Sequence, residues 1–359
     1  MGSFNPRAGA ETLIMDAIGA RPGDSLAIIA EDPSLGFYDS MVPLCVSDVA
    51  EQMGISVEII QIDSHVGPEV LPSNVRHALL TFDHVLFHSR LGDTLRFSEI
   101  PGGATKTMSY ALDISILGGP SCTVSHSVME EIRSAYDSRA DCAETWQISC
   151  KNGTEIIGTQ DIGVIARGEA EDFTVTRFPV CASRPISCDN ANGIVVFGHW
   201  LMASGNQQYP ECNLILDGLV SAIVENGNIR CFEGPSSLVA KVEAHYRRVG
   251  EFLGLNPWNV HSWHAGINPG CSYPVRGLHN IERWGKVAFA NPRYLHFHTC
   301  GGYAPGEIAW SLFDVTIKLG NEIIWDDGKL VFLDGSEVRK ILNLNKIESL
   351  EVRQDIGID

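Results

Sequence analysis

The feature that most constrains this chain is a change of pattern near residue 140. Before it, short apolar runs alternate with segments of helical periodicity; after it, β-like runs are separated by Asn-Gly and Asp-Gly pairs. The first pattern predicts a parallel sheet with helices on both faces, and the second predicts hairpins. We therefore expect an N-terminal α/β domain over residues 1–140, followed by a C-terminal domain of mixed or antiparallel α+β structure over residues 141–359.

The N-terminal half contains the clearest individual elements. Apolar runs predict strands at Ser25–Ala30, Val57–Ile62 and His84–Phe87, and helical spacing predicts helices at Met41–Met53 and Asn74–Thr81. The sequence has no GxGxxG or GxxxxGK[ST] motif at a strand-to-helix turn. A dinucleotide site or a P-loop is therefore not expected.

The C-terminal half is predicted to be rich in hairpins, with one long helix. We expect the helix at Ser236–Leu253 and β-like runs at 194–197, 213–224 and 323–332. The expected hairpin turns share a Gly in second place: Asn152-Gly153, Asn192-Gly193, Asn226-Gly227 and Asp327-Gly328.

Charge and cysteine content exclude several classes of protein. The chain carries 26 Lys and Arg against 44 Asp and Glu, a net charge of −18, whereas partners such as nucleic acid or an anionic membrane require a basic surface. No apolar run is long enough to span a membrane, and no signal peptide is evident. The ten cysteines form no CxxC pair, so we expect reduced thiols in a cytoplasmic protein.

Five of the twelve histidines lie between residues 261 and 298. His261 and His264 are three residues apart and share a face only if that segment is helical, whereas His296 and His298 are two apart and share one face of a strand. Imidazoles near a carboxylate can hold Zn²⁺ or Fe²⁺. The alternative is that these are hydrogen-bonded histidines of a core or a cleft, and composition alone favours that alternative.

The order of motifs after residue 258 resembles the dihydroxypyridine dioxygenases and, more remotely, the aminopeptidase T family. A Gly-x-Asn-Pro turn stands at 266–269, a Gly-Gly pair at 301–302, an x-x-Asp segment at 312–314 and a final strand at 323–329. The Pro-Gly-Asp opening at 22–24 also fits. The resemblance implies the same two-domain fold, and it implies self-association as a homodimer or larger homo-oligomer.

The resemblance also implies where metal ligands should stand, and two of those places have changed. Ser262 occupies the position four residues before Gly266, where the families have Glu or His, and Leu312 replaces the histidine of a His-x-Asp pair. Asp314 alone stands at its expected place. Since leucine has no donor atom and serine is a poor ligand for such a metal, the inherited site is predicted to be lost and no cofactor is expected.

A rearranged site is the alternative. His261 would take the first ligand place, and either His264 or His298 would replace the missing imidazole. With Asp314 they would restore a site of two histidines and one carboxylate for Fe(II) or Zn. The protein would then be a mononuclear Fe(II) ring-cleaving dioxygenase or, less favoured, a Zn-dependent hydrolase.

The favoured interpretation is a non-catalytic binder in a natural-product pathway, for example of ribosomal peptides. It would hold a peptide or an aromatic small molecule in a cleft between the domains, and it would work with enzymes of the same pathway. The expected ligand-binding residues are aromatic or imidazole side chains: Trp258, Trp263, His264, His296, His298, Tyr303 and Trp310.

Overall fold

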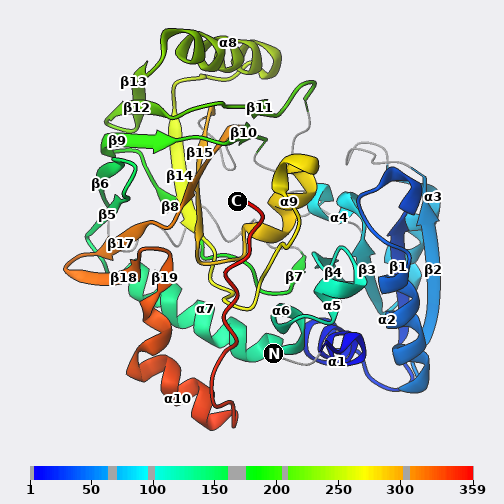
Figure 1. Ribbon diagram of the computed structural model, residues 1–359. Helices are drawn as coiled ribbons and strands as arrows, with labels where there is room; N and C mark the ends of the chain where they lie inside the picture. The colour runs from blue at the N-terminus through cyan, green and yellow to red at the C-terminus, as the bar shows by residue number, and fades with distance from the viewer. Residues whose placement is uncertain are drawn as a thin grey trace.

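The computed structural model describes residues 4–63, 71–95, 102–160, 175–203, 209–301 and 308–358. Within these residues the strands form one five-stranded, one six-stranded and one eight-stranded sheet. Figure 1 shows the five-stranded sheet at the right of the molecule and the two larger sheets at the left. The combination of an α/β part with an α+β part is the expected fold class.

The five-stranded sheet is parallel, with the order β2-β1-β3-β4-β7. Residues 26–31 of β1, which lies between β2 and β3, are all buried, which explains why the sequence shows an apolar run there rather than an alternation. Its strands are β1 (Ser25–Glu31), β2 (Ser56–Ile62), β3 (His84–His88), β4 (Thr105–Ser109) and β7 (Thr176–Phe178). The three strands predicted in this region are confirmed.

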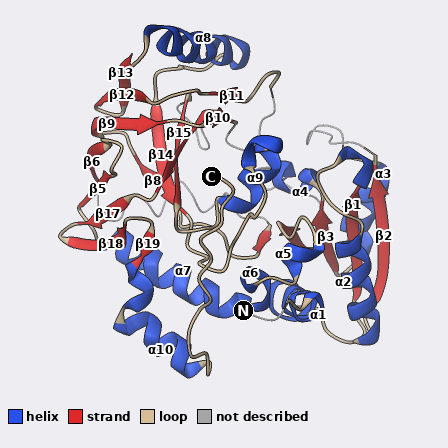
Figure 2. Cartoon of the chain, in the orientation of Figure 1, coloured by secondary structure: helices blue, strands red, loops and turns tan. Residues whose placement is uncertain are grey.

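Helices cover this sheet and join its strands (Figure 2). The predicted helices are confirmed as α2 and α3, and α2 ends just before Gly54, which has a positive φ. The helical elements of the first 141 residues are α1 (Pro6–Glu11), η1 (Thr12–Ile18), η2 (Pro33–Leu35), α2 (Met41–Gln52), α3 (Ser73–Thr81), α4 (Arg90–Leu95), α5 (Ile114–Leu117), α6 (Pro120–Thr123) and α7 (His126–Asp141).

The edge strand β7 comes from residues 176–178, so the chain returns to the parallel sheet after it has entered the second sheet system. The boundary between residues 140 and 141 stays a prediction, and part of the parallel sheet lies beyond it.

The six-stranded sheet has the order β11-β10-β16-β15-β14-β8, and each of its neighbouring pairs is antiparallel. Its strands are β8 (Ile186–Ser187), β10 (Trp200–Met202), β11 (Leu214–Ile215), β14 (Val260–Ala265), β15 (Tyr294–Thr299) and β16 (Ile308–Phe313).

The eight-stranded sheet has the order β13-β12-β9-β6-β5-β17-β18-β19 and is likewise antiparallel. Its strands are β5 (Thr145–Ser149), β6 (Glu155–Thr159), β9 (Asn192–Phe197), β12 (Val220–Glu225), β13 (Asn228–Glu233), β17 (Thr316–Leu319), β18 (Glu322–Asp326) and β19 (Lys329–Leu330).

Three of the four predicted hairpin turns are confirmed, and one is wrong. Asn152-Gly153, Asn226-Gly227 and Asp327-Gly328 join consecutive antiparallel strands. Asn192-Gly193 instead begins strand β9, where a Cβ on Gly193 would lie 2.2 Å from the Glu155 carbonyl oxygen of the neighbouring strand. Gly193 therefore allows the backbones of β9 and β6 to approach closely, and it does not form a turn.

The predicted helix over 236–253 is confirmed at both ends as α8 (Ser236–Leu253), which stops at Gly254 in the left-handed conformation. The predicted strand over 213–224 is broken into β11 and β12. The remaining helical elements are η6 (Gly277–His279), α9 (Ile281–Ala288), η7 (Val331–Asp334) and α10 (Ser336–Leu344). No described helix has the length and apolar character needed to cross a membrane.

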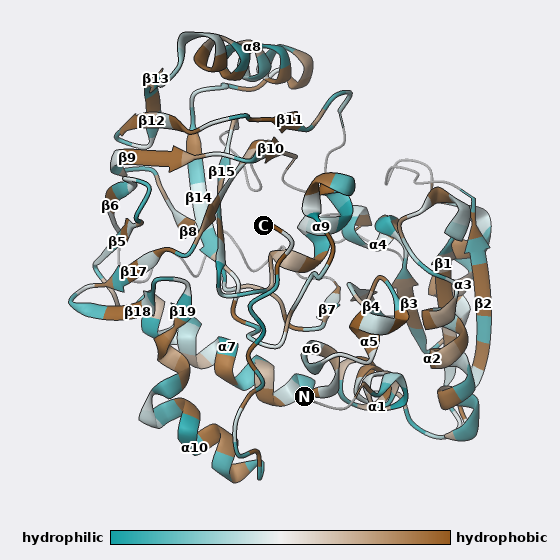
Figure 3. Cartoon of the chain, viewed as in Figure 1, coloured by the Kyte–Doolittle hydropathy of each residue, from teal (hydrophilic) through white to brown (hydrophobic). Residues whose placement is uncertain are grey.

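The two antiparallel sheets enclose one core. Trp263 of β14 packs against Trp146 of β5 with ring centroids 5.5 Å apart, and Trp310 of β16 stacks on Phe197 of β9 at 5.1 Å. Figure 3 shows apolar residues along β9 and the neighbouring β12, whose buried side chains belong to this core. The opposite face of the six-stranded sheet packs against α9, through Tyr294 and Trp284. This second face carries the candidate site.

Candidate metal centre

Three histidines share this second face of the six-stranded sheet. Side chains alternate along a strand, so His296 and His298 of β15 point to the same side, as predicted. The register places His264 of β14 directly opposite His296. All three side chains are buried.

A β-bulge in β14 excludes His261 from this group. The register with β15 shifts between Val260 and Ser262, so His261 is the additional residue. Its Nδ1 lies 2.7 Å from the hydroxyl of Ser262, and burial lowers the pKa of its imidazole. His261 and His264 could share a face only in a helix, and this segment is a strand.

The Nε2 atoms of the three histidines converge. The Nε2 of His264 lies 2.7 Å from that of His296 and 3.2 Å from that of His298. Nitrogens bound to one ion at about 2.0–2.1 Å lie about 2.8–3.0 Å apart in octahedral geometry and about 3.3–3.4 Å apart in tetrahedral geometry. The observed separations are close to this range, so a small adjustment of the rings would let all three bind one ion.

The backbone orients His264 for this arrangement. Its Nδ1 lies 3.0 Å from the carbonyl oxygen of Ser183. Because a carbonyl can only accept a hydrogen bond, Nδ1 carries the hydrogen, and the lone pair of the neutral ring is on Nε2. A histidine that ligates a metal typically donates its other N–H in this way.

The described residues bring together a different set of potential ligands from the one predicted. Among the described residues, the side chains of His264, His296 and His298 form a group whose potential donor atoms all lie within 4.8 Å of one another. His264 and His298 belonged to the predicted alternative set, and His296 was predicted as a ligand-binding residue. Neither His261 nor Asp314 joins them.

Asp314 is held by an ion pair instead. Asp314 lies in the turn that follows β16. Both of its carboxylate oxygens lie 2.7 Å from the guanidinium of Arg293. The residue has a φ of 50°, a conformation that non-glycine residues rarely adopt. Leu312 points to the opposite side of β16 from the histidines, into the core between the sheets.

The predicted ligand-binding tryptophans do not lie with the histidines. Trp263 and Trp310 occupy the other face of the same sheet and are buried in the core. The ring of Trp258 stacks on Tyr246 at 6.1 Å, and Arg247 covers it. Because successive side chains of a strand point to opposite faces, Trp263 and Trp310 lie on the other side of the sheet from the three histidines. Tyr303 lies outside the described residues, and the ligand-binding role of the whole set stays a prediction.

Sequence reasoning missed Ser183, which lies 81 residues before the histidine that it orients. Its contribution is a backbone carbonyl, so no side-chain pattern could have indicated it. Ser183 reaches β14 because Ala182 forms an isolated bridge with Gly266 and the Ser183 amide donates to the Ala265 carbonyl.

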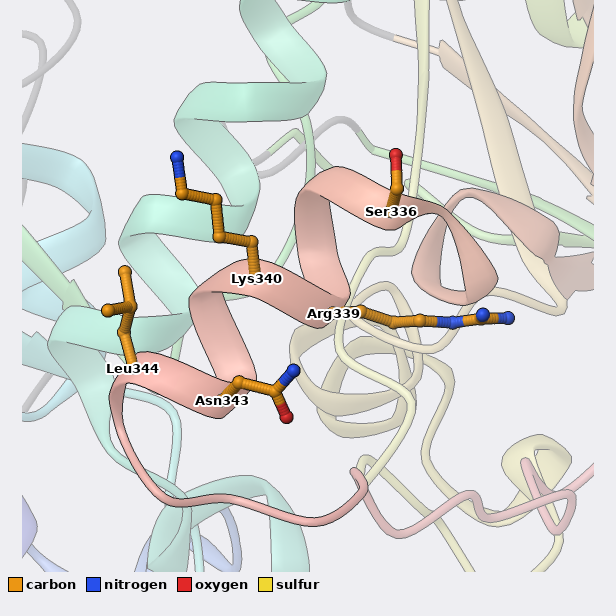
Figure 4. A pocket seen from close by; sticks show the side chains of 5 residues that line it. All are labelled: Ser336, Arg339, Lys340, Asn343 and Leu344. Atoms are coloured by element: carbon orange, nitrogen blue, oxygen red, sulfur yellow. The ribbon is translucent and has the colours of Figure 1, made fainter.

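A surface hollow of about 400 Å³ lies elsewhere, along one side of α10. Figure 4 shows that its five labelled side chains all come from this helix. They are Ser336, Arg339, Lys340, Asn343 and Leu344. None has the donor chemistry of a transition-metal site, so the histidine cluster is the stronger candidate.

No family profile and no curated protein sequence matches this chain. Solved structures do match. The 2,5-dihydroxypyridine dioxygenase from Pseudomonas putida KT2440 superposes with a TM-score of 0.57 at 13% identity, covering 92% of this chain and 97% of that one. AmpT from Thermus thermophilus gives a TM-score of 0.49 at 10% identity, covering 91% and 98%. The fold relationship to the dioxygenase is therefore confirmed, and such low identity shows the fold alone.

Proposed function

We propose that this protein binds one divalent transition-metal ion through His264, His296 and His298 and uses it in a reaction on a small molecule. The observation that supports the proposal is the convergence of three Nε2 atoms, at 2.7 and 3.2 Å from the central His264. Imidazole nitrogens suit Zn²⁺ and Fe²⁺, and we expect one of these two ions.

The number of ligands favours a reactive site over a structural one. Structural zinc sites use four protein ligands, whereas catalytic sites use three and leave a position for water or substrate. The described residues supply three. When bound, the ion would act as a Lewis acid toward an oxygen atom of water or substrate.

The protein itself would supply orientation. The Ser183 carbonyl holds the ring of His264 in one tautomer, while strand pairing fixes the spacing of His264 and His296. Ligands carried on paired strands, one of them with its ring held by a backbone carbonyl, keep a site preorganised.

Metal analysis of the purified protein tests this proposal. Protein prepared without added metal should contain about one Zn or Fe per chain, and His296→Ala and His298→Ala should each reduce this to near zero. The matched control is His261→Ala, which removes a half-buried imidazole from β14 outside the cluster and should retain the ion. Circular dichroism identifies variants that fail to fold, and Co²⁺ substitution reports ligand loss from its visible spectrum.

Two results would contradict the proposal. One is folded wild-type protein without Zn or Fe that also fails to take up Co²⁺. The other is equal loss of metal in His261→Ala and His298→Ala.

The second candidate is the non-catalytic binder of a peptide or aromatic intermediate. It is favoured by Ser262 and Leu312, which stand where the resemblance implies metal ligands, and by the ion pair that engages Asp314. Under this alternative, metal-free protein should be thermally stabilised by its ligand, and His298→Ala should bind that ligand without any dependence on metal.

A further inference from the structure

Three polar side chains meet at the edge of the parallel sheet where its strands begin. Asp24 immediately precedes β1, His84 begins β3 and Thr105 begins β4. These three strands lie side by side (Figure 1), and their register places His84 directly opposite Thr105. Parallel pairing thus makes neighbours of residues that are 21 and 60 positions apart in the sequence.

The three side chains form a series of hydrogen bonds from a carboxylate through an imidazole to a hydroxyl. Nε2 of His84 lies 3.1 Å from Oδ2 of Asp24, and Nδ1 of the same ring lies 2.6 Å from Oγ1 of Thr105. The hydrogen bond with His84 holds the pKa of the Asp24 carboxyl below its usual value, and an ionised carboxylate can only accept. Nε2 of the neutral ring therefore carries the hydrogen, and Nδ1 accepts the hydrogen bond that the Thr105 hydroxyl donates.

This order of groups is the one that activates a weak nucleophile. A hydroxyl becomes reactive where a base lies within about 2.6–3.2 Å of it and a third group orients that base. His84 and Asp24 meet these two conditions for Thr105. An array that served only to join the strand ends would not need an accessible hydroxyl, yet Thr105 is exposed while His84 is buried.

The surroundings of Thr105 leave room for a reactant. Gly103, two residues earlier, is also exposed, and a Cβ added to it would meet no described atom within 4 Å apart from those of its chain neighbours. The nearby carboxylate of Asp83 bonds to the amide and hydroxyl of Ser25, at 2.8 and 2.7 Å. The imidazole therefore has Asp24 as its carboxylate partner.

We propose that Thr105 is a nucleophile for acyl transfer from an ester, with His84 as its general base and Asp24 as the residue that positions His84. Oγ1 of Thr105 attacks the carbonyl carbon of the ester, and the hydroxyl proton passes to Nδ1 of His84. When the bond from the acyl carbon to the alkoxy oxygen breaks, His84 returns this proton to the departing alcohol, which leaves an acyl ester on Thr105. Water then attacks the acyl ester with His84 again as base, releasing the carboxylic acid and restoring the hydroxyl.

This proposal is independent of the proposed metal centre, because the histidine cluster lies on the six-stranded sheet. None of the steps at Thr105 requires an ion. Its experiment therefore gives the same result whether or not the protein binds a metal.

Reaction of the full-length protein with p-nitrophenyl acetate tests the proposal. Samples quenched in acid at successive times and analysed by peptide mass spectrometry give the rate of acetylation at residue 105. We expect an acetyl ester on Thr105 that forms and then decays. Thr105→Ser should retain this reaction, and His84→Ala should slow it about a hundredfold, which is the contribution of a general base.

Two further measurements separate a chemical role from a structural one. Imidazole added to His84→Ala should restore part of the rate, because a free base can occupy the space of the missing ring. Asp24→Glu, which keeps the carboxylate, should retain more of the rate than Asp24→Asn. Circular dichroism identifies variants that fail to fold.

Thr81 is the matched control. It is an exposed threonine of α3 whose hydroxyl donates to the His77 carbonyl at 2.8 Å, so it should stay unmodified, and Thr81→Ala should react at Thr105 as the wild type does. Folded wild-type protein in which Thr105 is acetylated no faster than Thr81 would overturn the proposal. So would an unchanged rate at Thr105 in folded His84→Ala.

Discussion

His264 shows how much of the candidate site depends on single contacts. Its ring is fixed by a backbone carbonyl, and a carbonyl stays in place when the side chain of Ser183 is replaced. Substitutions at Ser183 should therefore affect the site only by displacing the backbone.

The ends of the site-bearing strands are also strained, since Cys300 follows β15 with a φ of 62° and Asp314 follows β16 with a φ of 50°. Such conformations cost of order 1–3 kcal/mol each and persist where the surrounding structure holds them.

His88, at the end of β3, should make stability depend on pH. Its side chain is buried against Tyr38, with ring centroids 4.5 Å apart, and burial lowers the pKa of His88 to about 3. In the unfolded chain the imidazole of His88 has a pKa of about 6.5. Between the folded and the unfolded pKa, His88 is protonated in the unfolded state and neutral in the folded state. The free energy of unfolding therefore decreases as the pH falls through this range.

We expect His88→Phe to reduce this acid sensitivity. The wild type should lose up to about 1.4 kcal/mol of unfolding free energy per pH unit from this residue below pH 6.5. Urea unfolding between pH 7 and 4.5 measures the slope, and the exposed His77→Phe is the control for losing one histidine. An unchanged slope in His88→Phe would contradict the assignment.

Among the elements, α9 joins the parallel sheet to the rest of the molecule by ion pairs. Lys286 bonds to the buried Asp93 of α4, and Arg283 lies 2.5 Å from Asp113 at the start of α5. The same helix packs on the histidine-bearing sheet through Trp284, which contacts Tyr294 at 5.2 Å. Because one helix contacts both parts, its position couples the parallel sheet to the candidate site.

Removing Lys286 should be costly at this junction. Lys286→Met removes a cation that is bonded to the buried Asp93 carboxylate, and we expect a loss of about 3–5 kcal/mol in unfolding free energy. Asp93→Asn combined with Lys286→Met removes the charge as well, and Asn still accepts a hydrogen bond from Tyr110. The double variant should therefore recover most of the loss in urea unfolding. A double variant that is less stable than Lys286→Met would refute the buried charge as the cause.

At the scale of the whole molecule, the C-terminal segment links parts that are distant in sequence. Figure 1 shows it running from α10 back to α9. The Ile356 carbonyl accepts a hydrogen bond from the indole of Trp284 at 2.5 Å, and the Asp355 carbonyl accepts one from the Tyr273 amide. The side chain of Ile356 is buried in the core that α9 shares with the parallel sheet.

Deleting residues 352–359 should therefore destabilise the whole protein. Loss of one buried isoleucine and of hydrogen bonds to Trp284 and Tyr273 should lower the unfolding free energy by about 3 kcal/mol or more. Urea unfolding followed by tryptophan fluorescence measures the change. Val352→Asp, at an exposed position of the same segment, should behave as the wild type. A truncated chain with wild-type stability would show that the segment only lies on the surface.

The sequence by itself determined the fold class and many of the elements. Apolar runs and helical periods located β1, β3, α2 and α8, because these signals arise from local burial and from glycine at the chain turns. The order of motifs after residue 258 also indicated the dioxygenase-like fold. Local pattern failed at Asn192-Gly193, where the glycine is required by a neighbouring strand rather than by a turn.

Only the tertiary structure decided which side chains meet. The bulge at His261 and the register of β14 against β15 place His264 beside His296 and His298, and they send Trp263 to the opposite face. The Ser183 carbonyl and the Arg293 side chain, which engage His264 and Asp314, come from elsewhere in the chain. The spacing of residues along one strand limits which face they share, but pairing between strands is set by packing across the whole sheet.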